Sequence, residues 1–327
     1  MHIDKKPYIS VVIPAYNSAP TLAHTIEACL SQDYPKDKLE ILVADDGSLD
    51  NTREIVNNFP VKYIYQKRSG PASARNNGWL SSSGEWVCFI DADCVPHRDW
   101  VSKLTRHYGA ANIGAVAGSY AVDGLQYLLD KFVHYEIKYR HSRMSKYTSS
   151  FGTYNVMVKR SVLEELNGFN PFYRHASGED SDLAYRIIKA GYKIYFEKEA
   201  LVSHSNILRF WRYLLIQFRH GFWRMKLYTK NSPMIIKDEY AYWKDYLEIF
   251  LAFALIFCLL SNVPNQFIIS ALLAIALFGV QVHLPLKIAL EQKDIRYLIF
   301  SGVAFIRIFV RIAGGILGFV AFWIIRR

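Results

Sequence analysis

Two carboxylates, Asp91 and Asp93, follow a short apolar segment at 86–90 that has the composition of a buried strand. The turn Asp91-Ala92-Asp93 presents both carboxylates on one side. Hard oxygen ligands of this kind hold Mg²⁺ or Mn²⁺ while substrate phosphates complete the coordination shell. An ordinary solvated turn can have the same sequence, so the pair indicates a divalent metal site only where other residues support it.

A second acidic group, Glu179, Asp180 and Asp182, follows Gly178 at the start of a predicted helix over 179–190. Acidic side chains in the first turn of a helix are stabilised by the helix dipole, which explains this group without any chemistry. A carboxylate that is ionised and within hydrogen-bond reach of a substrate hydroxyl can also act as a general base. The residues alone leave both interpretations open.

Four short apolar segments, rich in β-branched residues, predict the strands of one sheet. They lie at 8–13, 39–44, 61–65 and 86–90. Helical patterns at 20–31 and 51–58 separate the first three strands, which predicts a βαβαβ arrangement. Polar residues such as Asp45 and Asp46 come directly after the strands. Because ligands bind beyond the carboxyl ends of strands in open α/β sheets, we expect the site at that edge.

The composition favours an anionic partner and a reducing compartment. A net charge of +10 and an aromatic content of 15% suit a phosphate-rich substrate, a nucleic acid or an acidic membrane surface. The four cysteines have no pairwise metal spacing, and Cys258 lies in an apolar C-terminal region, so a disulfide framework is not expected. The N-terminus lacks the apolar stretch of a signal peptide, which predicts a cytoplasmic location for the soluble part.

The C-terminal region has the composition of a membrane anchor. Residues 249–286 contain no Asp, Glu, Lys or Arg and are about twice as long as one span. Asn262 and Pro264 interrupt their middle, which predicts a helical hairpin over 246–286. Upstream, basic residues alternate with aromatic residues over 207–228. This pattern favours a helix at the membrane interface over an ordinary amphipathic surface helix.

A third apolar segment, 297–325, carries Arg307 and Arg311 one helical turn apart. Charged side chains at that depth are costly unless they face protein, water or an anionic headgroup. A full crossing would also place Arg326 and Arg327 outside, against the positive-inside tendency. The segment is therefore a third span, or a re-entrant or interfacial helix, and the sequence leaves these alternatives open.

Five motifs, taken in order, resemble those of the family 2 glycosyltransferases of the GT-A fold. They are Val11–Asn17, Ala44–Thr52, Ala74–Gly78, Phe89–Asp93 and Gly178–Leu183. The resemblance spans about residues 8–210 and points to the membrane-anchored type of bacteria and archaea. The implied fold class is α/β, a Rossmann-like GT-A nucleotide-diphospho-sugar transferase domain followed by C-terminal transmembrane helices.

The resemblance and the apolar pattern together imply three parts. We expect a glycosyltransferase domain at 1–205, amphipathic interfacial helices at 206–245 and a transmembrane region at 246–327. The transmembrane region comprises the hairpin at 246–286 and the apolar segment at 297–325.

The resemblance also implies roles for individual residues. Nucleotide contacts are expected from Pro14, Ala15, Tyr16, Asp45, Asp46, Arg75, Asp91 and Ala92. Among these, Asp45 would accept a hydrogen bond from the base edge, and Arg75 would lie against the nucleotide or diphosphate. Ligands of Mn²⁺ or Mg²⁺ are expected from Asp93, Asp91 and His204. Asp180 would be the catalytic base, tuned by Arg186, and Glu179 would help to position the acceptor.

The implied activity is metal-dependent transfer of a hexose from a UDP- or GDP-sugar to a hydroxyl of a lipid-linked or cell-surface glycan, with inversion at the anomeric carbon. The expected partners are the nucleotide-sugar donor, the lipid-linked glycan acceptor and membrane lipids. Nucleic acid is not expected, because the basic residues concentrate beside the apolar region. We expect a multi-pass membrane protein of cell-envelope polysaccharide synthesis, with its catalytic domain in the cytoplasm.

Three other functions share part of this pattern. A polyprenyl-phosphate sugar synthase shares the fold and the membrane tail, but its phosphate acceptor needs no base, so Gly178-Glu179-Asp180 argues for a hydroxyl acceptor. A processive polysaccharide synthase carries Gln-x-x-Arg-Trp, whereas residues 217–221 read Gln-Phe-Arg-His-Gly, which favours single-sugar transfer. A non-catalytic scaffold of the same fold would be expected to lose carboxylates that this sequence retains.

Overall fold

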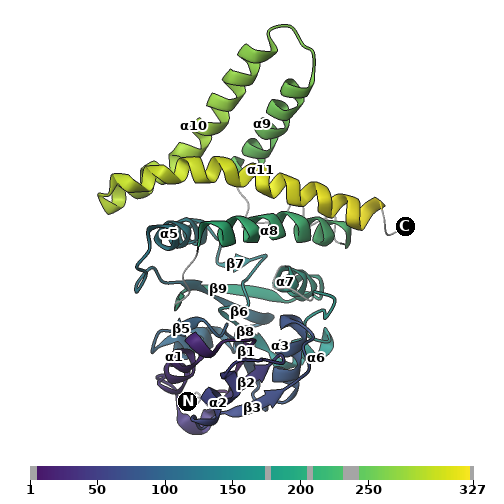
Figure 1. Ribbon diagram of the computed structural model, residues 1–327. Coiled ribbons are helices and arrows are strands. Elements are labelled where there is room, and N and C mark those ends of the chain that lie inside the picture. The colour runs from purple at the N-terminus through teal and green to yellow at the C-terminus, as the bar shows by residue number, and fades with distance from the viewer. Residues whose placement is uncertain (1–5, 174–177, 205–208, 231–242, 325–327) are drawn as a thin grey trace. The chain divides into compact units, whose positions relative to one another are not determined.

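The computed structural model describes residues 6–173, 178–204, 209–230 and 243–324 (Figure 1). The chain divides into two compact units. The sheet unit comprises Met1–Leu125 and Lys138–Asn206, and the helical unit comprises Gln126–Ile137 and Ile207–Arg327. The helix α5 (Leu128–Ser142) contributes residues to both units.

The described residues of the sheet unit form a nine-stranded mixed sheet in the order β3-β2-β1-β4-β8-β6-β9-β5, with β7 paired to β9. The first four strands are parallel, and β8 is antiparallel to both β4 and β6. The strands are β1 (Ile9–Ala15), β2 (Leu39–Asp45), β3 (Lys62–Tyr65), β4 (Trp86–Phe89), β5 (Cys94–Pro96), β6 (Ile113–Tyr120), β7 (Tyr147–Thr148), β8 (Val156–Lys159) and β9 (Lys193–His204). The four predicted strands are confirmed. The antiparallel half of the sheet was not predicted.

Helices cover both faces of this sheet (Figure 1). Alternate side chains of β1 point to opposite faces, so Val11 packs in one apolar cluster with Leu22 of α1, and Val12 packs in the other with Trp79 of α3. The helices are α1 (Ala19–Leu30), α2 (Thr52–Asn57), α3 (Pro71–Leu80), α4 (Trp100–Leu104), α6 (Arg160–Glu165) and α7 (Glu179–Lys189). The predicted helices at 20–31, 51–58 and 179–190 are confirmed, whereas α3 was not predicted as a helix.

The helical unit contains α8 (Phe210–Lys230), α9 (Trp243–Leu260), α10 (Gln266–Gln292) and α11 (Phe300–Phe319). The helices α9 and α10 lie side by side as a hairpin (Figure 1). Within the described residues, two helical stretches are long and apolar enough to cross a membrane, Gln266–Gln292 and Ile295–Ile324. The shorter α9 has charged residues in its first two turns.

The side chain of Asn155 joins β6, β9 and α4 inside the sheet unit. Its Nδ2 donates to the carbonyl oxygens of Ser119 at 2.9 Å and Ala200 at 2.8 Å. Its Oδ1 accepts from the indole Nε1 of Trp100 at 2.7 Å. The side chain is fully satisfied at a buried position, so it fixes the unpredicted half of the sheet.

We expect Asn155→Ala to lower the free energy of unfolding of the sheet unit by about 3 kcal/mol, because it leaves a buried indole N–H and two carbonyls without this partner. Thermal unfolding followed by calorimetry measures the change. Asn57→Ala at an exposed position is the control and should stay within about 0.5 kcal/mol of the parent. Equal Tm values for the two variants would contradict this role of Asn155.

Candidate active site

The turn after β4 is fixed by hydroxyl groups of α1. Thr21 and Thr25 both donate from Oγ1 to the carbonyl oxygen of Ala92, at 2.8 Å and 3.0 Å. The Thr25 side chain is buried, and Ala92 is 7% exposed. The backbone of Ala92 therefore anchors the turn, and this anchor sets the directions of Asp91 and Asp93 on either side.

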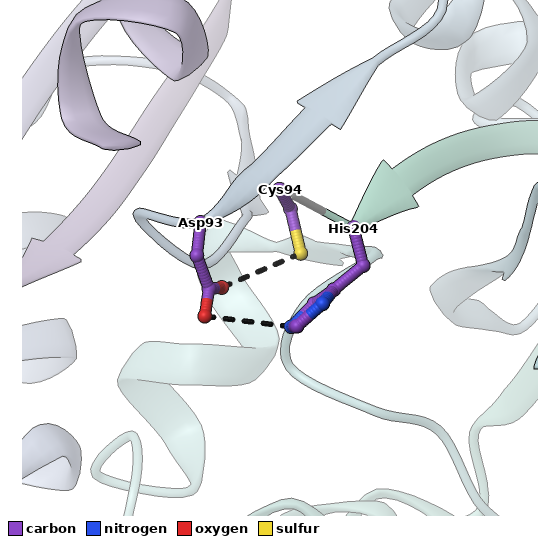
Figure 2. Close-up of side chains that lie close together, drawn as sticks. All are labelled: Asp93, Cys94 and His204. Atoms are coloured by element: carbon purple, nitrogen blue, oxygen red, sulfur yellow. Dashed lines mark hydrogen bonds and ion pairs between the residues drawn. The ribbon is translucent and has the colours of Figure 1, made fainter. Parts of the chain in front are cut away.

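Asp93 and His204 come together because of strand pairing. The short strand β5 is antiparallel to β9, with Cys94 opposite His204 in the register. His204 Nε2 lies 3.4 Å from Asp93 Oδ2, and both side chains are about a quarter exposed, at 25% and 28% (Figure 2). One donor atom each from Asp93, Cys94 and His204 lies within 4.8 Å of the others. Two of the three predicted metal ligands thus share one site.

Cys94 was not singled out from the sequence, although it directly follows Asp93 and faces His204. Its Sγ lies 3.8 Å from Asp93 Oδ1 (Figure 2). Burial, together with the neighbouring carboxylates of Asp93 and Asp91, raises the pKa of the Cys94 thiol well above its ordinary value. Because a thiol binds metal as the thiolate, Asp93 and His204 are the stronger candidate donors of this cluster.

Arg75, on α3, forms a buried bridge between two carboxylates. Nη2 donates to Asp91 Oδ1 at 2.8 Å, and Nη1 donates to Glu179 Oε1 at 2.9 Å. The side chains of Arg75 and Glu179 are each 3% exposed. Burial favours the neutral guanidinium, but Asp91 and Glu179 more than offset this and raise the pKa of Arg75, so it stays charged. The bridge places the start of α7 next to the turn after β4.

The bridge gives both residues protein partners that were not predicted. Arg75 is predicted to lie against the nucleotide or diphosphate, and Asp91 to reach the ribose or metal. In the structure, both Nη atoms of Arg75 bond to protein carboxylates, and Asp91 directs Oδ1 toward Arg75. Asp91 keeps a side chain that is 37% exposed, so only one face of its carboxylate is committed to the bridge.

Asp180 follows Glu179 in the first turn of α7. The preceding Gly178 has φ +98°, in the left-handed region where glycine is favoured, so the chain can turn sharply into the helix. Burial raises the pKa of Asp180, and the charge of Asp91 adds to this, while the Ser181 amide and Arg75 act in the opposite direction. Asp180 is half-buried beside the bridge, where a proton acceptor with a raised pKa can operate.

Arg186 was expected to tune Asp180, but its guanidinium has other partners. It donates to Asp182 Oδ2 and to the carbonyl oxygens of Leu166 and Gly168, each at 2.8 Å. Its bonds therefore hold α7 against the segment after α6. Arg75 takes the place expected of Arg186, because its charge lowers the pKa of Asp180.

At the ends of β1 and β2, the predicted nucleotide residues are tied to loops. Asp45 accepts from the Ser48 amide at 2.8 Å and from the Tyr63 hydroxyl at 2.6 Å. Asp46 accepts from the Ser69 and Gly70 amides at 2.7 and 2.9 Å. Both carboxylates are buried, so they shape the loops around the strand ends.

Tyr16 gains a neighbour that the sequence did not reveal. It follows Pro14 and the buried Ala15 at the end of β1 and is half-buried. The guanidinium of the exposed Arg68 lies 3.6 Å from the centre of the Tyr16 ring. Arg68 belongs to the loop that Asp46 holds, and its only sequence signal is its position shortly after β3. The pair offers an aromatic face and a positive charge at the same edge of the sheet.

Comparison with known proteins decides the family. Residues 10–166 match the sequence profile described as "Glycosyl transferase family 2", and residues 133–207 match one described as "N-terminal domain of galactosyltransferase". Glycosyltransferase AglE of Haloferax volcanii is 33% identical over 227 residues, which are 66% of this chain and 72% of AglE. This chain is a family 2 glycosyltransferase. Its activity is nucleotide-sugar-dependent glycosyl transfer.

Two further relatives support the assignment and the fold. Probable glycosyltransferase YdaM of Bacillus subtilis is 30% identical over 253 residues, but the match spans only 59% of YdaM and 67% of this chain. The mannosyltransferase PcManGT of Pyrobaculum calidifontis, solved with GDP-Man and Mn²⁺, superimposes with a TM-score of 0.61 at 21% identity. That alignment covers 96% of the glycosyltransferase described here and 88% of PcManGT, and it establishes the GT-A fold.

Arg75→Lys tests whether Arg75 in this glycosyltransferase positions Asp91 and Glu179 or contacts the nucleotide. A lysine ammonium cannot bond to both carboxylates at once, as the two Nη atoms of the Arg75 guanidinium do. We expect kcat to fall about 100-fold through misplacement of the catalytic groups. The Kd of UDP or GDP, measured by calorimetry, should change by no more than a factor of about two. Loss of one hydrogen bond to the nucleotide would raise Kd by more than this.

Arg160→Lys is the matched control for this variant. Arg160 donates from Nε to the Gly84 carbonyl and from Nη2 to the Ser82 hydroxyl, both at 2.6 Å, so the change also removes a fork inside the sheet unit. It should lower Tm and leave kcat unchanged. A large loss of nucleotide affinity in Arg75→Lys alone would show that Arg75 contacts the nucleotide.

Proposed function

We propose that this enzyme is an inverting glycosyltransferase that moves a sugar from a UDP- or GDP-sugar to a hydroxyl of a lipid-linked or cell-surface glycan at the cytoplasmic face of a membrane. The Arg75 bridge is the observation that carries the proposal. It brings Asp180 to the edge of the sheet that also holds Asp93 and His204. A proton acceptor and a cation site at one edge are what transfer to a hydroxyl needs.

In the proposed reaction, Asp180 takes the proton of the acceptor hydroxyl. The hydroxyl oxygen attacks the anomeric carbon as the bond from that carbon to the nucleoside diphosphate breaks, and the electron pair of that bond leaves with the diphosphate. Attack opposite the leaving group inverts the configuration, so an α-linked donor gives a β-linkage. Glu179, held by Arg75, fixes the first turn of α7 and so the position of Asp180.

Two observations favour a hydroxyl acceptor and single-sugar transfer. A phosphate acceptor is already anionic and needs no base, whereas Asp180 has a raised pKa beside the bridge. Gln217 is the residue that corresponds to the glutamine of the processive motif Gln-x-x-Arg-Trp. Its side chain is buried and accepts a hydrogen bond from Arg311 Nε at 2.8 Å. Its side chain is thus bonded within the helical unit. Polyprenyl-phosphate synthesis remains the main alternative enzyme activity.

The donor set of Asp93 and His204 suits Mn²⁺ or Mg²⁺. A carboxylate oxygen and an imidazole nitrogen 3.4 Å apart, each partly exposed, leave room for substrate oxygens, and imidazole favours Mn²⁺ over Mg²⁺. When bound, the cation would neutralise charge on the departing diphosphate. PcManGT, which shares the fold, was solved with GDP-Man and Mn²⁺.

Membrane attachment is supported by the surface of the hairpin α9–α10. Its large apolar side chains are widely exposed, and residues 249–286 carry no charge. Among them are Phe250, Phe257, Leu260, Phe267 and Ile275, exposed by 69%, 69%, 84%, 80% and 69%. We propose the division into 1–205, 206–245 and 246–327 on this basis, although residues 231–242 lie outside the described ranges. All four cysteines are free thiols, which supports a cytoplasmic catalytic domain.

Asp180→Asn should lower kcat about 1000-fold while the Kd of the nucleotide-sugar is retained, because the amide cannot accept the acceptor proton. In the parent enzyme, burial raises the pKa of Asp180 above the ordinary value of 3.8, and only the ionised form is a base. The rate of transfer should therefore fall with decreasing pH through a pKa above 3.8.

Asp182→Asn is the control in the same helical turn, because the Asp182 carboxylate bonds to Arg186. Asp182→Asn should lower Tm. It should leave unchanged both the rate of transfer and the fall of that rate with decreasing pH. Rates are measured with radiolabelled UDP- and GDP-sugars and short-chain lipid-linked acceptors. Parent-like turnover in Asp180→Asn would remove this residue from the role of base.

Removal of divalent cations with EDTA should abolish transfer, and added Mn²⁺ should restore it. Asp93→Ala should weaken Mn²⁺ binding in the presence of UDP or GDP about 100-fold, because loss of a supporting residue alone costs roughly 10–100-fold. Electron paramagnetic resonance of free Mn²⁺ measures the affinity. Asp123→Ala is the control, since its exposed carboxylate pairs with His97. Full activity in metal-free buffer would disprove the cation requirement.

A further inference from the structure

The helices α8 and α11 run side by side and in the same direction (Figure 1). Tyr213 bonds to Arg307, and Gln217 bonds to Arg311. The ring of Phe222 lies 5.0 Å, in a tilted arrangement, from the ring of Phe322, just beyond the end of α11. Residue numbers increase together along both helices, so the two are parallel. The contact continues to Lys226, whose ammonium lies 5.7 Å from the Phe322 ring centre. It therefore extends over about 20 Å at 1.5 Å per residue.

Glycines bring the two helix backbones into close contact. An added Cβ at Gly221 would lie 2.1 Å from the Arg311 carbonyl oxygen. One at Gly314 would lie 2.1 Å from the Phe218 oxygen, and one at Gly318 would lie 2.3 Å from the Phe222 oxygen. Small residues spaced in this way permit backbone contact between helices. The helix α11 therefore cannot change its inclination without taking α8 with it.

The charges of α8 are incompatible with the hydrocarbon core. Arg212, Arg219 and Arg224 are exposed on this helix, next to the 78% exposed Trp211. Arginine in the hydrocarbon core is strongly disfavoured, whereas basic and aromatic side chains together suit the headgroup region. A helix of this kind lies along a bilayer surface. Its parallel partner α11 must lie there too.

The two arginines of α11 are bonded inside the helical unit. Arg307, 2% exposed, donates to the Tyr213 hydroxyl at 3.1 Å and bonds to Glu136, which is also buried. Arg311 donates to Gln217 of α8 at 2.8 Å. Their charges thus belong to the contact with α8 and α5. Another surface of the helical stretch Ile295–Ile324 exposes apolar side chains, among them Ile306, Leu317 and Ile324.

The hairpin α9–α10 packs on the face of α11 that points away from α8, so α11 lies between α8 and the hairpin (Figure 1). Ala252 and Leu255 of α9 and Leu277 of α10 form one apolar cluster with Ile308 of α11. Along the two helices of the hairpin, the exposed side chains between its base and its tip are apolar, as at Phe257 and Phe267. The change from a charged helix pair to this apolar stretch marks the boundary between headgroups and hydrocarbon.

We infer that α8 and α11 lie together in the plane of the membrane surface, among anionic lipid headgroups, and that α11 does not cross the bilayer although its length and hydropathy permit a span. The inference rests on the membrane attachment proposed above. The hairpin alone then enters the hydrocarbon. Because α11 begins and ends on one side, the conflict of a third crossing with the positive-inside tendency disappears.

Nitroxide labels at four exposed positions of the helical stretch Ile295–Ile324, which includes α11, test this inference. Ile299→Cys, Ile306→Cys, Leu317→Cys and Ile324→Cys are each prepared in the full chain, whose native cysteines are buried. The labelled proteins are reconstituted into vesicles of phosphatidylethanolamine and phosphatidylglycerol. Depth is measured from relaxation by oxygen and by a nickel chelate. We expect depths within about 10 Å of one another, the diameter of one helix.

A crossing helix gives a different depth profile. The 25 residue steps from 299 to 324 would then span about 37 Å at 1.5 Å per step, and depth would change steadily from one surface to the other. That gradient would overturn the inference and leave the proposed attachment intact. Phe267→Cys in the hairpin should report hydrocarbon, and Lys189→Cys in the sheet unit should report water. Protein that stays in the aqueous phase would overturn both the attachment and the inference.

The side of the membrane provides a second readout. A membrane-impermeant maleimide, added to vesicles with the sheet unit outside, should modify Ile299→Cys and Ile324→Cys at similar rates after detergent-free reconstitution. Lys189→Cys identifies vesicles of that orientation. Modification of Ile299→Cys alone, with Ile324→Cys reacting only after permeabilisation, would show that α11 crosses.

Discussion

The candidate active site depends on one buried positive charge, that of Arg75. The guanidinium of Arg75 lies in a low-dielectric interior, where it is tolerated only because Asp91 and Glu179 neutralise it. These residues come from α3, from the turn after β4 and from α7, so charge neutrality requires three distant segments to meet. The adjacent Asn76 adds to this by bonding both the amide and the carbonyl of Phe169. Folding of the sheet unit and assembly of the site are therefore the same event.

The parallel half of the fold could be predicted from the sequence because its signals are local. The strands β1 and β2 are apolar runs with polar residues at their carboxyl ends, and this pattern alone places Asp45 and Asp46 at the ligand edge. Asp93 and His204 were both predicted as metal ligands, and the structure brings their side chains together. Their contact, however, results from the pairing of β5 with β9, which no local pattern predicted.

The partners of Arg75 could not be read from the sequence. Arg75 and Glu179 are separated by 104 residues, and an arginine near a phosphate-binding edge looks the same whether it contacts a ligand or a protein carboxylate. The same holds for Arg68 over Tyr16. Composition indicates which groups are present at an edge of a sheet. Only the register of distant strands decides which of them neutralise one another and which remain available to substrate.

The helical unit shows the same limit for a membrane anchor. Hydropathy averages over a segment, whereas a bilayer acts on each face of a helix separately. The apolar mean of Ile295–Ile324 includes Arg307, whose charge is neutralised by Glu136 far away in the sequence. The mean hydropathy of this stretch also takes no account of α8. This helix has exposed arginines and packs along α11, so the two helices tilt together. If the inference about α11 holds, its depth is set by α8, the more polar helix that its glycines contact.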